Sequence, residues 1–531
     1  MQIWACTSSS PDANQQFTLT STPGSGASTG GPDSVTIPVA AGSAAQVTGN
    51  LVSLSIEQDR WLDWSGNATQ NTFFFNCLDN IVQITGVPPK IRIGADSEDH
   101  TNFNPNVQGV QDSFPPPTTT VPYPEATSIV AAYFARFIGT GVTWGVNFGG
   151  ANLTAVFLET QAIISAFASS AFTQAGITLD NLELGNEADL YTNNGLRTSG
   201  FNIQQYTTQW IQFATNLTAA AKLSSSKTRL WAGAFAESSH SSTGFSPQGI
   251  FANNILSSAP GAFIETISQH HYSGSFCSGS GGLLQDLMTK ATIRSNLSSF
   301  SPDIQAVHGQ GLNYVFGETN SYSCHGAPGV SNTAGAALWT LDYALFASQI
   351  GATQVYFHEG VGYKVRGTLI QPATLTRSIL DGSALSSPLA SHVQPQYYAA
   401  IIIAEAIGSS GSTQVVELTI NDSRMAGYAF YESGTLKRAV FINSLAWLST
   451  STGTRPSTHV SLAFSGGSGS TSFTVKRLVI GHADDASGLT WGGQTYETSD
   501  GRVGGTATTE SGTVAAGIDI PATQAVMLTF T

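Results

Sequence analysis

Two glutamates, far apart in the sequence, occupy settings in which a carboxyl group can do chemistry. Glu187 lies in the stretch Leu184-Gly-Asn-Glu-Ala-Asp189, and Glu318 lies in Phe316-Gly-Glu-Thr-Asn320. Two carboxyl groups held roughly 5–5.5 Å apart can cleave a glycosidic bond with retention, because one protonates the leaving oxygen while the other attacks the anomeric carbon. Asn186 is placed to hydrogen-bond the sugar 2-hydroxyl, an interaction that strengthens in the transition state.

The elements that must position these glutamates follow a repeating pattern from about residue 50 to residue 410. Short β-rich runs alternate there with stretches of helical periodicity, which is typical of βα units around a parallel sheet. Eight strands are expected, at residues 51–57, 90–94, 142–148, 181–185, 229–234, 263–270, 313–317 and 353–358. Helices are expected at residues 71–84, 127–138, 154–170, 203–222, 284–308 (with a break at Pro302) and 334–350. The pattern predicts an α/β fold, a (β/α)8 TIM barrel.

Chemistry in such barrels sits at the C-terminal ends of the strands. Glu187 follows the expected fourth strand and Glu318 the seventh. A single Asn-Glu pair after a strand is more often the start of a loop or helix, where the helix dipole stabilises the glutamate. Two such glutamates in one barrel favour the catalytic interpretation. As an acid, Glu187 needs a raised pKa, obtainable from partial burial and from the charge of Glu318.

Beyond about residue 410 the pattern changes to short alternating runs separated by Gly, Ser and Asn. They lie at residues 413–420, 426–431, 438–443, 473–480 and 525–530, and they predict an antiparallel β-sandwich domain. Residues 34–48 include Val-Thr-Ile-Pro-Val, too far ahead of the first barrel strand to belong to it, so we assign them to the same sandwich. The expected division is an N-terminal sandwich segment at 1–45, a catalytic barrel at 46–410 and a C-terminal sandwich at 411–531.

Composition restricts the classes of partner. The 531-residue chain has a net charge of −14, and only 10% of its residues are charged, against an average near 25%. Nucleic acid is disfavoured because phosphate binding needs clustered Lys and Arg, and no apolar run approaches the ~18 residues of a membrane span. We expect a secreted monomer without a cofactor. Asn-x-Ser/Thr sequons, which are glycosylation candidates in a secreted protein, occur at Asn67, Asn152, Asn216, Asn296 and Asn421.

The cysteines are too few and too dispersed for a disulfide scaffold. They are Cys6, Cys77, Cys277 and Cys324, and no Cys/His spacing indicates zinc, so no metal site is expected. In the predicted barrel, Cys277 and Cys324 lie in neighbouring loops on the catalytic face. Their disulfide is therefore preferred among the three possible full pairings. Cys77, within an apolar stretch, is expected to be a buried thiol.

Motifs across the whole barrel make the chain resemble glycoside hydrolase family 79 of clan A, the family of microbial and fungal β-glucuronidases and of heparanase. They are Arg92-Ile-Gly-Ala-Asp-Ser97, Leu182-Glu-Leu-Gly-Asn-Glu187, His270-His-Tyr272, Phe316-Gly-Glu-Thr-Asn-Ser321 and Phe357-His-Glu-Gly-Val-Gly-Tyr363. The resemblance implies retention of configuration, Glu187 as acid/base, Glu318 as nucleophile, and the split sandwich. One departure is Gly94-Ala95-Asp96-Ser97, where the family more often shows Gly-Gly-Asn-Ser; Asp96 and Ser97 are nevertheless candidate sugar contacts.

Further candidates each have a plainer alternative. Tyr272 is similar to the clan tyrosine that hydrogen-bonds the nucleophile, but it can also be a buried rim tyrosine. His271, like its neighbour His270, can contact sugar hydroxyls or be a satisfied core group. Glu359 can bind a sugar hydroxyl or cap the barrel rim. Arg92 and Glu183 are expected to form an inward ion pair beneath the site, with a structural role and an electrostatic effect on Glu318.

Recognition of a uronic acid requires a cation or a set of hydrogen-bond donors for its C6 carboxylate. The resemblance implies that the loop after Glu318 meets this carboxylate, through Tyr322, His325 and the backbone near Gly326. Tyr363, after the eighth strand, is a further candidate, followed by Lys364 and Arg366.

The leading hypothesis is a retaining exo-β-glucuronidase that removes terminal β-linked glucuronic acid, with or without a 4-O-methyl group, from glycoconjugates. Other clan A β-glycosidases (glucosidase, xylosidase or galactosidase) form the second class. An endo-acting heparanase-like enzyme would need a basic cleft, which 20 Lys plus Arg against 34 Asp plus Glu disfavours. A non-catalytic carbohydrate-binding protein is the fourth hypothesis, and the presence of both glutamates argues against it.

Overall fold

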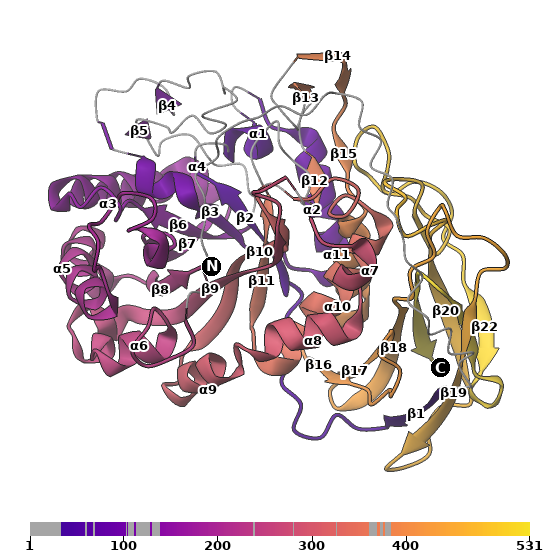
Figure 1. Ribbon diagram of the computed structural model, residues 1–531. Coiled ribbons are helices and arrows are strands. Elements are labelled where there is room, and N and C mark those ends of the chain that lie inside the picture. Colours follow the sequence, from indigo (N-terminus) through magenta and orange to yellow (C-terminus); the bar gives the residue numbers. More distant parts are fainter. Residues whose placement is uncertain are drawn as a thin grey trace.

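The computed structural model describes residues 33–58, 61–66, 69–101, 103–104, 111–112, 128–129, 139–236, 239–279, 281–324, 326–359, 369–371, 375–377 and 384–531. They form a closed parallel barrel with a β-sandwich beside it (Figure 1). The sandwich lies on the side of the barrel that carries helices α8, α10 and α11, whose bounds are given below.

The barrel confirms the predicted fold class and its eight strands. They are β2 (Val52–Glu57), β3 (Ile91–Gly94), β6 (Gly141–Val146), β7 (Thr178–Leu184), β8 (Arg229–Phe235), β9 (Ile264–Ser275), β10 (Asn313–Ser323) and β11 (Gln354–Glu359). Every neighbouring pair is parallel, and β11 pairs with β2 to close the ring. All eight carboxyl ends therefore open on one face.

Helices cover the outside of the barrel. They are α1 (Trp61–Ser65), α2 (Thr72–Thr85), α3 (Leu153–Phe167), α4 (Ser170–Gln174), α5 (Ile203–Ala221), α6 (Pro247–Ala252), α7 (Leu284–Leu287), α8 (Lys290–Ser298), α9 (Ser301–Gly309), α10 (Ala334–Ile350) and α11 (Gln396–Ile407). Asparagine side chains cap the N-termini of several of these helices. The Oδ1 of Asn152, for example, accepts the N–H groups of Thr154 and Ala155 at the start of α3.

The structure differs from the predicted helices in three places. Residues 284–308 form three helices rather than two, and Pro302 begins α9 in the first turn, where its missing N–H costs nothing. Helix α11 was not expected, because its uniformly apolar residues show no amphipathic period. The helix expected at 127–138 is wrong for residues 128–129, which form strand β5 (Ser128–Ile129) opposite β4 (Gln111–Asp112); the remainder lies outside the described residues.

The sandwich is built from two sheets. One contains β16 (Thr413–Glu417), β17 (Met425–Glu432), β18 (Thr435–Asn443), β24 (Gln524–Phe530), β20 (Ser472–Val479), β21 (Thr490–Trp491) and β22 (Glu510–Thr513). The other contains β1 (Asp33–Pro38), β19 (Ser457–Ser465) and β23 (Ile518–Pro521). The assignment of the N-terminal segment to the sandwich is confirmed, although β1 runs parallel to β19 in an otherwise antiparallel pattern.

Short two-stranded pieces complete the described chain. They are β12 (Ile370–Gln371) with β15 (His392–Val393), and β13 (Leu375–Arg377) with β14 (Ala384–Leu389).

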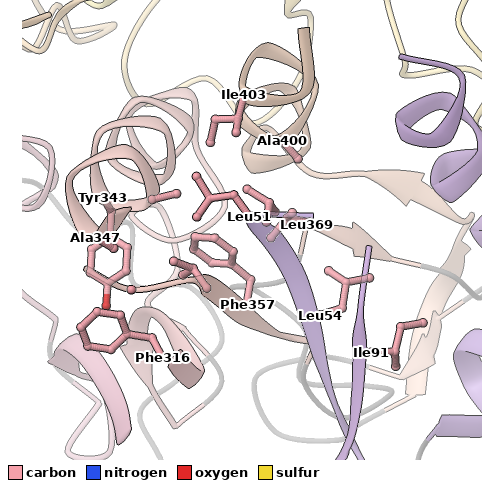
Figure 2. Packing of buried hydrophobic residues seen from close by; sticks show 14 of the residues in the cluster. Leu51, Leu54, Ile91, Phe316, Tyr343, Ala347, Phe357, Leu369, Ala400 and Ile403 are labelled. Atoms are coloured by element: carbon pink, nitrogen blue, oxygen red, sulfur yellow. The ribbon is translucent and has the colours of Figure 1, made fainter. Parts of the chain in front are cut away.

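A single apolar cluster runs from the barrel into the sandwich. Leu51 and Phe357 at the barrel wall face α10 and α11, where Ala347 and Ala400 lie (Figure 2). The same cluster includes Met527 of β24, so the two parts share buried surface. This packing lies outside the barrel wall, so the carboxyl ends of the strands stay available for a site.

Candidate active site

The two predicted carboxylates meet at the carboxyl end of the barrel. One oxygen of Glu187, one oxygen of Glu318 and a ring nitrogen of His270 lie within 4.8 Å of one another. This separation is nearer to the roughly 5–5.5 Å of retaining glycosidases than to the roughly 6.5–9.5 Å of inverting ones. The Glu187 side chain is 21% exposed and that of Glu318 is 9% exposed, so both can reach a ligand.

A sharp turn after β7 aims Glu187 into the mouth of the barrel. Gly185 (φ 81°) and Glu187 (φ 48°) both adopt left-handed backbone conformations. A Cβ atom at position 185 would lie 2.6 Å from the Tyr191 hydroxyl, so only glycine fits. The N–H of Glu187 donates to the carbonyl of Ala234, which holds the strained residue against the end of β8.

Glu318 is surrounded by groups that favour its ionised form. The Tyr272 hydroxyl donates to Oε1 at 2.7 Å, and Arg92 donates from Nη1 to Oε2 at 2.7 Å. The His358 Nδ1 lies 3.8 Å from Oε1. Burial pushes the pKa of Glu318 upward, but His358, His270, Arg92 and the Tyr272 hydrogen bond outweigh it and hold the pKa well below its usual range. The side chain is therefore poised as an anion.

Glu187 has the opposite poise. Burial, followed by the negative charges of Glu318, Asp189 and Asp96, raises the pKa of Glu187 well above its ordinary value. The His270 Nδ1 lies 2.9 Å from its Oε1. Two carboxyl groups whose surroundings drive their pKa values apart are the usual division between an acid and a nucleophile.

Arg92 links Glu318 to Asn186, the residue before Glu187. It is fully buried on β3 and donates from Nε to both Glu183 oxygens at 3.0 and 3.1 Å, which confirms the predicted ion pair. It also donates to Ser55 Oγ at 3.0 Å and to Asn186 Oδ1 at 2.8 Å. With Oδ1 engaged, the amide nitrogen of Asn186 is the atom placed to donate to a sugar hydroxyl.

Glu187, His270 and Glu318 could in principle supply three ligands to a metal ion. The Arg92 guanidinium, however, lies 2.7 Å from Glu318 and opposes a second cation in the same place. The arrangement suits a neutral sugar ring better than a metal.

The residues expected after β3 differ in their placement. Asp96 is exposed, and its charge acts on Glu187. Ser97 is buried, and its hydroxyl donates to Glu57 Oε2 at 2.5 Å. Ser97 therefore supports Glu57.

The placement of His271 corrects its assignment as a sugar contact. Alternation along β9 points His270 and Tyr272 at the carboxylates and His271 to the outer face. Its ring stacks on Tyr343 of α10 at 6.1 Å and meets Phe300 edge-on at 5.2 Å. His271 is a packing residue between barrel and helices.

Glu359 is likewise corrected to the second of its two expected roles. Its side chain is fully buried and accepts the N–H groups of Leu369 at 3.1 Å and Ile370 at 3.4 Å. Burial raises the pKa of Glu359 to about 8. It holds the returning chain at the rim and does not face the sugar site.

The loops after β9 and β10 are joined by the predicted disulfide, Cys277–Cys324, with Cα atoms 5.1 Å apart. Tyr322 is buried beneath Gly274 and Gly282, where added Cβ atoms would lie 2.4 and 2.3 Å from its ring and hydroxyl. Gly326, also buried, has a φ of 81°. Cys77 is the predicted buried thiol. Cys6, His325 and Tyr363 lie outside the described residues.

Three groups near the site were not predicted as site residues. Glu57 ends the first barrel strand and His358 is the last residue but one of the eighth. The His358 Nε2 lies 3.7 Å from Glu57 Oε1. The strand-end rule that identified Glu187 could have identified them. Asp99, in the 3-10 helix η1 (Asp96–His100), carries no such signal and becomes visible only through its partners, described below.

Four of the five sequons lie in the described part of the chain. Asn152 and Asn421 are exposed, Asn216 and Asn296 are half-buried, and Asn67 lies outside the described residues. Among the residues with assigned structure, no helix is long and apolar enough to cross a bilayer.

The chain is similar to known proteins along most of its length. The Glycosyl hydrolase family 79 C-terminal beta domain matches residues 427–527. The chain is 26% identical to a β-glucuronidase of Neurospora crassa over 496 residues (84% of each chain). It is also 26% identical to one of Aspergillus niger over 471 residues (84% of this chain, 82% of the other).

Solved structures share the fold. A 4-O-α-L-rhamnosyl-β-D-glucuronidase from Fusarium oxysporum 12S superposes with a TM-score of 0.76 at 22% identity, covering 94% of this chain and 100% of that one. A family 51 α-L-arabinofuranosidase from Bifidobacterium longum gives a TM-score of 0.58 at 12% identity, covering 94% and 100%. With the matched family 79 β domain, similarity to β-glucuronidases along most of the chain and a pair of carboxyl groups at the barrel mouth, this protein is a glycoside hydrolase that resembles glycoside hydrolase family 79.

Proposed function

We propose that this enzyme is a retaining exo-β-glucuronidase that releases terminal β-linked glucuronic acid by double displacement. The observation that carries the proposal is the pair Glu187 and Glu318, which lie within 4.8 Å and have pKa values shifted in opposite directions. Similarity to two β-glucuronidases over most of the chain supports the substrate class.

In the first step, a carboxylate oxygen of Glu318 attacks the anomeric carbon, and the bond to the aglycone oxygen breaks. Glu187 donates its proton to that oxygen, so the aglycone leaves as a neutral alcohol and an α-glycosyl ester remains on Glu318. Tyr272 and Arg92 keep Glu318 ionised until it reacts.

In the second step, Glu187 removes a proton from water, which attacks the same carbon and releases glucuronic acid with its β configuration. Formation of the ester removes the negative charge of Glu318, one of the causes that raise the pKa of Glu187. The pKa of Glu187 therefore falls at the stage where it must act as a base.

The C6 carboxylate is assigned to the loop that follows β10. The proposed hydrogen-bond donors to this anion are Tyr322 near the end of β10, His325 and Gly326 in the loop that follows, and Tyr363 after β11. The exposed sequons Asn152 and Asn421 and the disulfide fit a secreted protein, because disulfides persist in oxidising compartments. Monomeric action without a cofactor completes the proposal.

A panel of 4-nitrophenyl β-glycosides tests the substrate class. We expect turnover of the glucuronide and little of the glucoside, xyloside or galactoside. Clear glucoside turnover without glucuronide turnover would contradict the proposal and favour another clan A β-glycosidase.

Azide rescue tests the two roles. With azide, Glu318→Ala should form α-glucuronosyl azide, and Glu187→Ala should form β-glucuronosyl azide from a substrate with a good leaving group. The matched control is Glu265→Ala, because Glu265 is an exposed carboxylate on β9. The products are assigned by NMR, and near-normal turnover without azide in either active-site variant would remove that glutamate from its role.

A further inference from the structure

Asp99 is a buried carboxylate near the site that the mechanism above does not use. Its Oδ1 accepts the N–H groups of Phe148 at 2.9 Å and Gly149 at 2.7 Å. Its Oδ2 accepts the N–H of Asn186 at 2.9 Å and the hydroxyl of Tyr191 at 2.6 Å. Both oxygens are thus fully engaged by four donors.

Asp99 and its donors come from three consecutive βα connections. Asp99 lies in η1 after β3, Phe148 and Gly149 follow β6, and Asn186 follows β7. A Cβ atom added to Gly149 would lie 2.8 Å from the Cβ of Asp99, so a glycine is needed for the backbone to come this close. The contact is therefore a built feature of the barrel mouth.

The link from Asp99 to the chemistry runs through one residue, Asn186. Asn186 immediately precedes Glu187, and its N–H is held by Asp99 while the N–H of Glu187 is held by the Ala234 carbonyl at 2.8 Å. Two left-handed residues, Gly185 and Glu187, flank Asn186. A backbone in such a conformation persists only where its surroundings hold it.

A buried carboxylate is costly unless hydrogen bonds compensate its lost hydration. Asp99 has that compensation, whereas an amide at the same position would turn an NH2 group toward N–H and O–H donors. Tyr191 is itself held in place, because Arg197 lies over its ring at 5.1 Å. Loss of the Asp99 acceptor would therefore free the Gly185–Asn186 peptide, next to Glu187, first.

We propose that Asp99 is a positioning residue that aims the carboxyl group of Glu187 at the leaving oxygen of the substrate. The inference rests on the proposed role of Glu187 as general acid. It predicts a defect confined to proton donation, because the hydrogen bonds of Asp99 within the described residues run to Phe148, Gly149, Asn186 and Tyr191 and not to Glu318.

The test is Asp99→Asn with aryl β-glucuronides whose leaving groups differ in acidity. For the phenyl glucuronide, which needs a proton donor, we expect kcat/KM to fall about 100-fold, a size that a misplaced acid can cause. For the 2,4-dinitrophenyl glucuronide, whose anion leaves unaided, the fall should stay below about 5-fold. Because kcat/KM reports the steps up to formation of the glycosyl ester, the later base role of Glu187 does not enter.

Two further variants keep the test decisive. Tyr191→Phe removes one of the four donors and should give a smaller difference of the same kind, and it replaces Asp99→Asn if the latter does not fold. Asp303→Asn is the matched control, because Asp303 is a buried carboxylate on α9 that accepts from Gln248 and contacts His240. It should change all substrates by one common factor.

An equal loss on phenyl and dinitrophenyl substrates in both Asp99→Asn and Tyr191→Phe would overturn the inference and leave Asp99 a structural residue. Failure of the proposed function looks different, because the wild-type enzyme would then turn over another β-glycoside. In that case the same leaving-group comparison is made with aryl forms of the accepted sugar, and it still decides the role of Asp99.

Discussion

Tyr272→Phe removes one hydrogen bond from the nucleophile and leaves the rest of the site in place. The lost bond is the 2.7 Å contact from the tyrosine hydroxyl to Glu318 Oε1. Arg92 still donates to the other oxygen at 2.7 Å. Because the lost donor favours the charged carboxylate, the pKa of Glu318 should rise in the variant. As the pH is lowered, the variant should therefore begin to lose activity at a higher pH than the wild type does.

The size follows from the kind of bond. A hydrogen bond to a charged group contributes about 1.5–3 kcal/mol. At about 1.4 kcal/mol per tenfold change in equilibrium, this moves the acid limb of the pH profile up by roughly one to two pH units. If the hydrogen bond from Tyr272 keeps its full strength until Glu318 attacks, its loss need not lower kcat/KM on the pH plateau. If the loss also disturbs the orientation of Glu318, kcat/KM on the plateau falls as well.

The assay is kcat/KM for 4-nitrophenyl β-glucuronide from pH 2.5 to 8, with enzyme stability checked at each acidic point. Tyr314→Phe is the matched control, because Tyr314 lies on β10 and donates its hydroxyl hydrogen bond to Gln269 Oε1, at 3.0 Å. An acid limb that coincides in Tyr272→Phe, Tyr314→Phe and wild type would refute the reasoning that Tyr272 holds Glu318 ionised.

Three further predictions concern stability. Cys277→Ser combined with Cys324→Ser opens a loop of 47 residues and should cost about 2–4 kcal/mol in urea unfolding under non-reducing conditions; an unchanged midpoint would contradict this. Burial raises the pKa of Glu159 from 4.5 to about 8, so the folded protein keeps a proton that the unfolded chain releases, and stability falls as pH rises between these values. Glu159→Gln should flatten that fall in the calorimetric Tm, and an equally steep decline would reject the assignment. Arg294→Leu removes the cation that donates two hydrogen bonds to Asp342, at 2.7 and 2.9 Å, and leaves this buried carboxylate with the Tyr428 hydroxyl as a donor but without that opposite charge. The change should cost about 3–5 kcal/mol, measured by the urea midpoint; a loss below about 1 kcal/mol would show that the pair is dispensable.

The catalytic pair could be predicted because the signal is local. A strand followed by Asn-Glu, or ending in Gly-Glu, is readable from neighbouring residues, and the barrel rule places every strand end on one face. Cys277 and Cys324 followed from the same rule, since their loops leave adjacent strands.

Side-chain direction on a strand is less readable, as His271 shows. The motif His270-His-Tyr272 does not say which of its residues face the barrel interior, and the contacts of His270 and Tyr272 with the two glutamates decide it. Glu359 was ambiguous for another reason, because its partners Leu369 and Ile370 return to it from beyond the strand.

By itself, the sequence determined the eight-strand repeat, the N-terminal contribution to the sandwich, the two glutamates and the family. Only the tertiary structure decided which charges act on them. Arg92 joins Glu183, Asn186 and Glu318, and Asp99 joins three separate loops, across distances in the chain that no local pattern encodes. The physical reason is that periodicity and motifs report covalent neighbours, whereas pKa values and side-chain aim depend on groups brought together when the barrel closes.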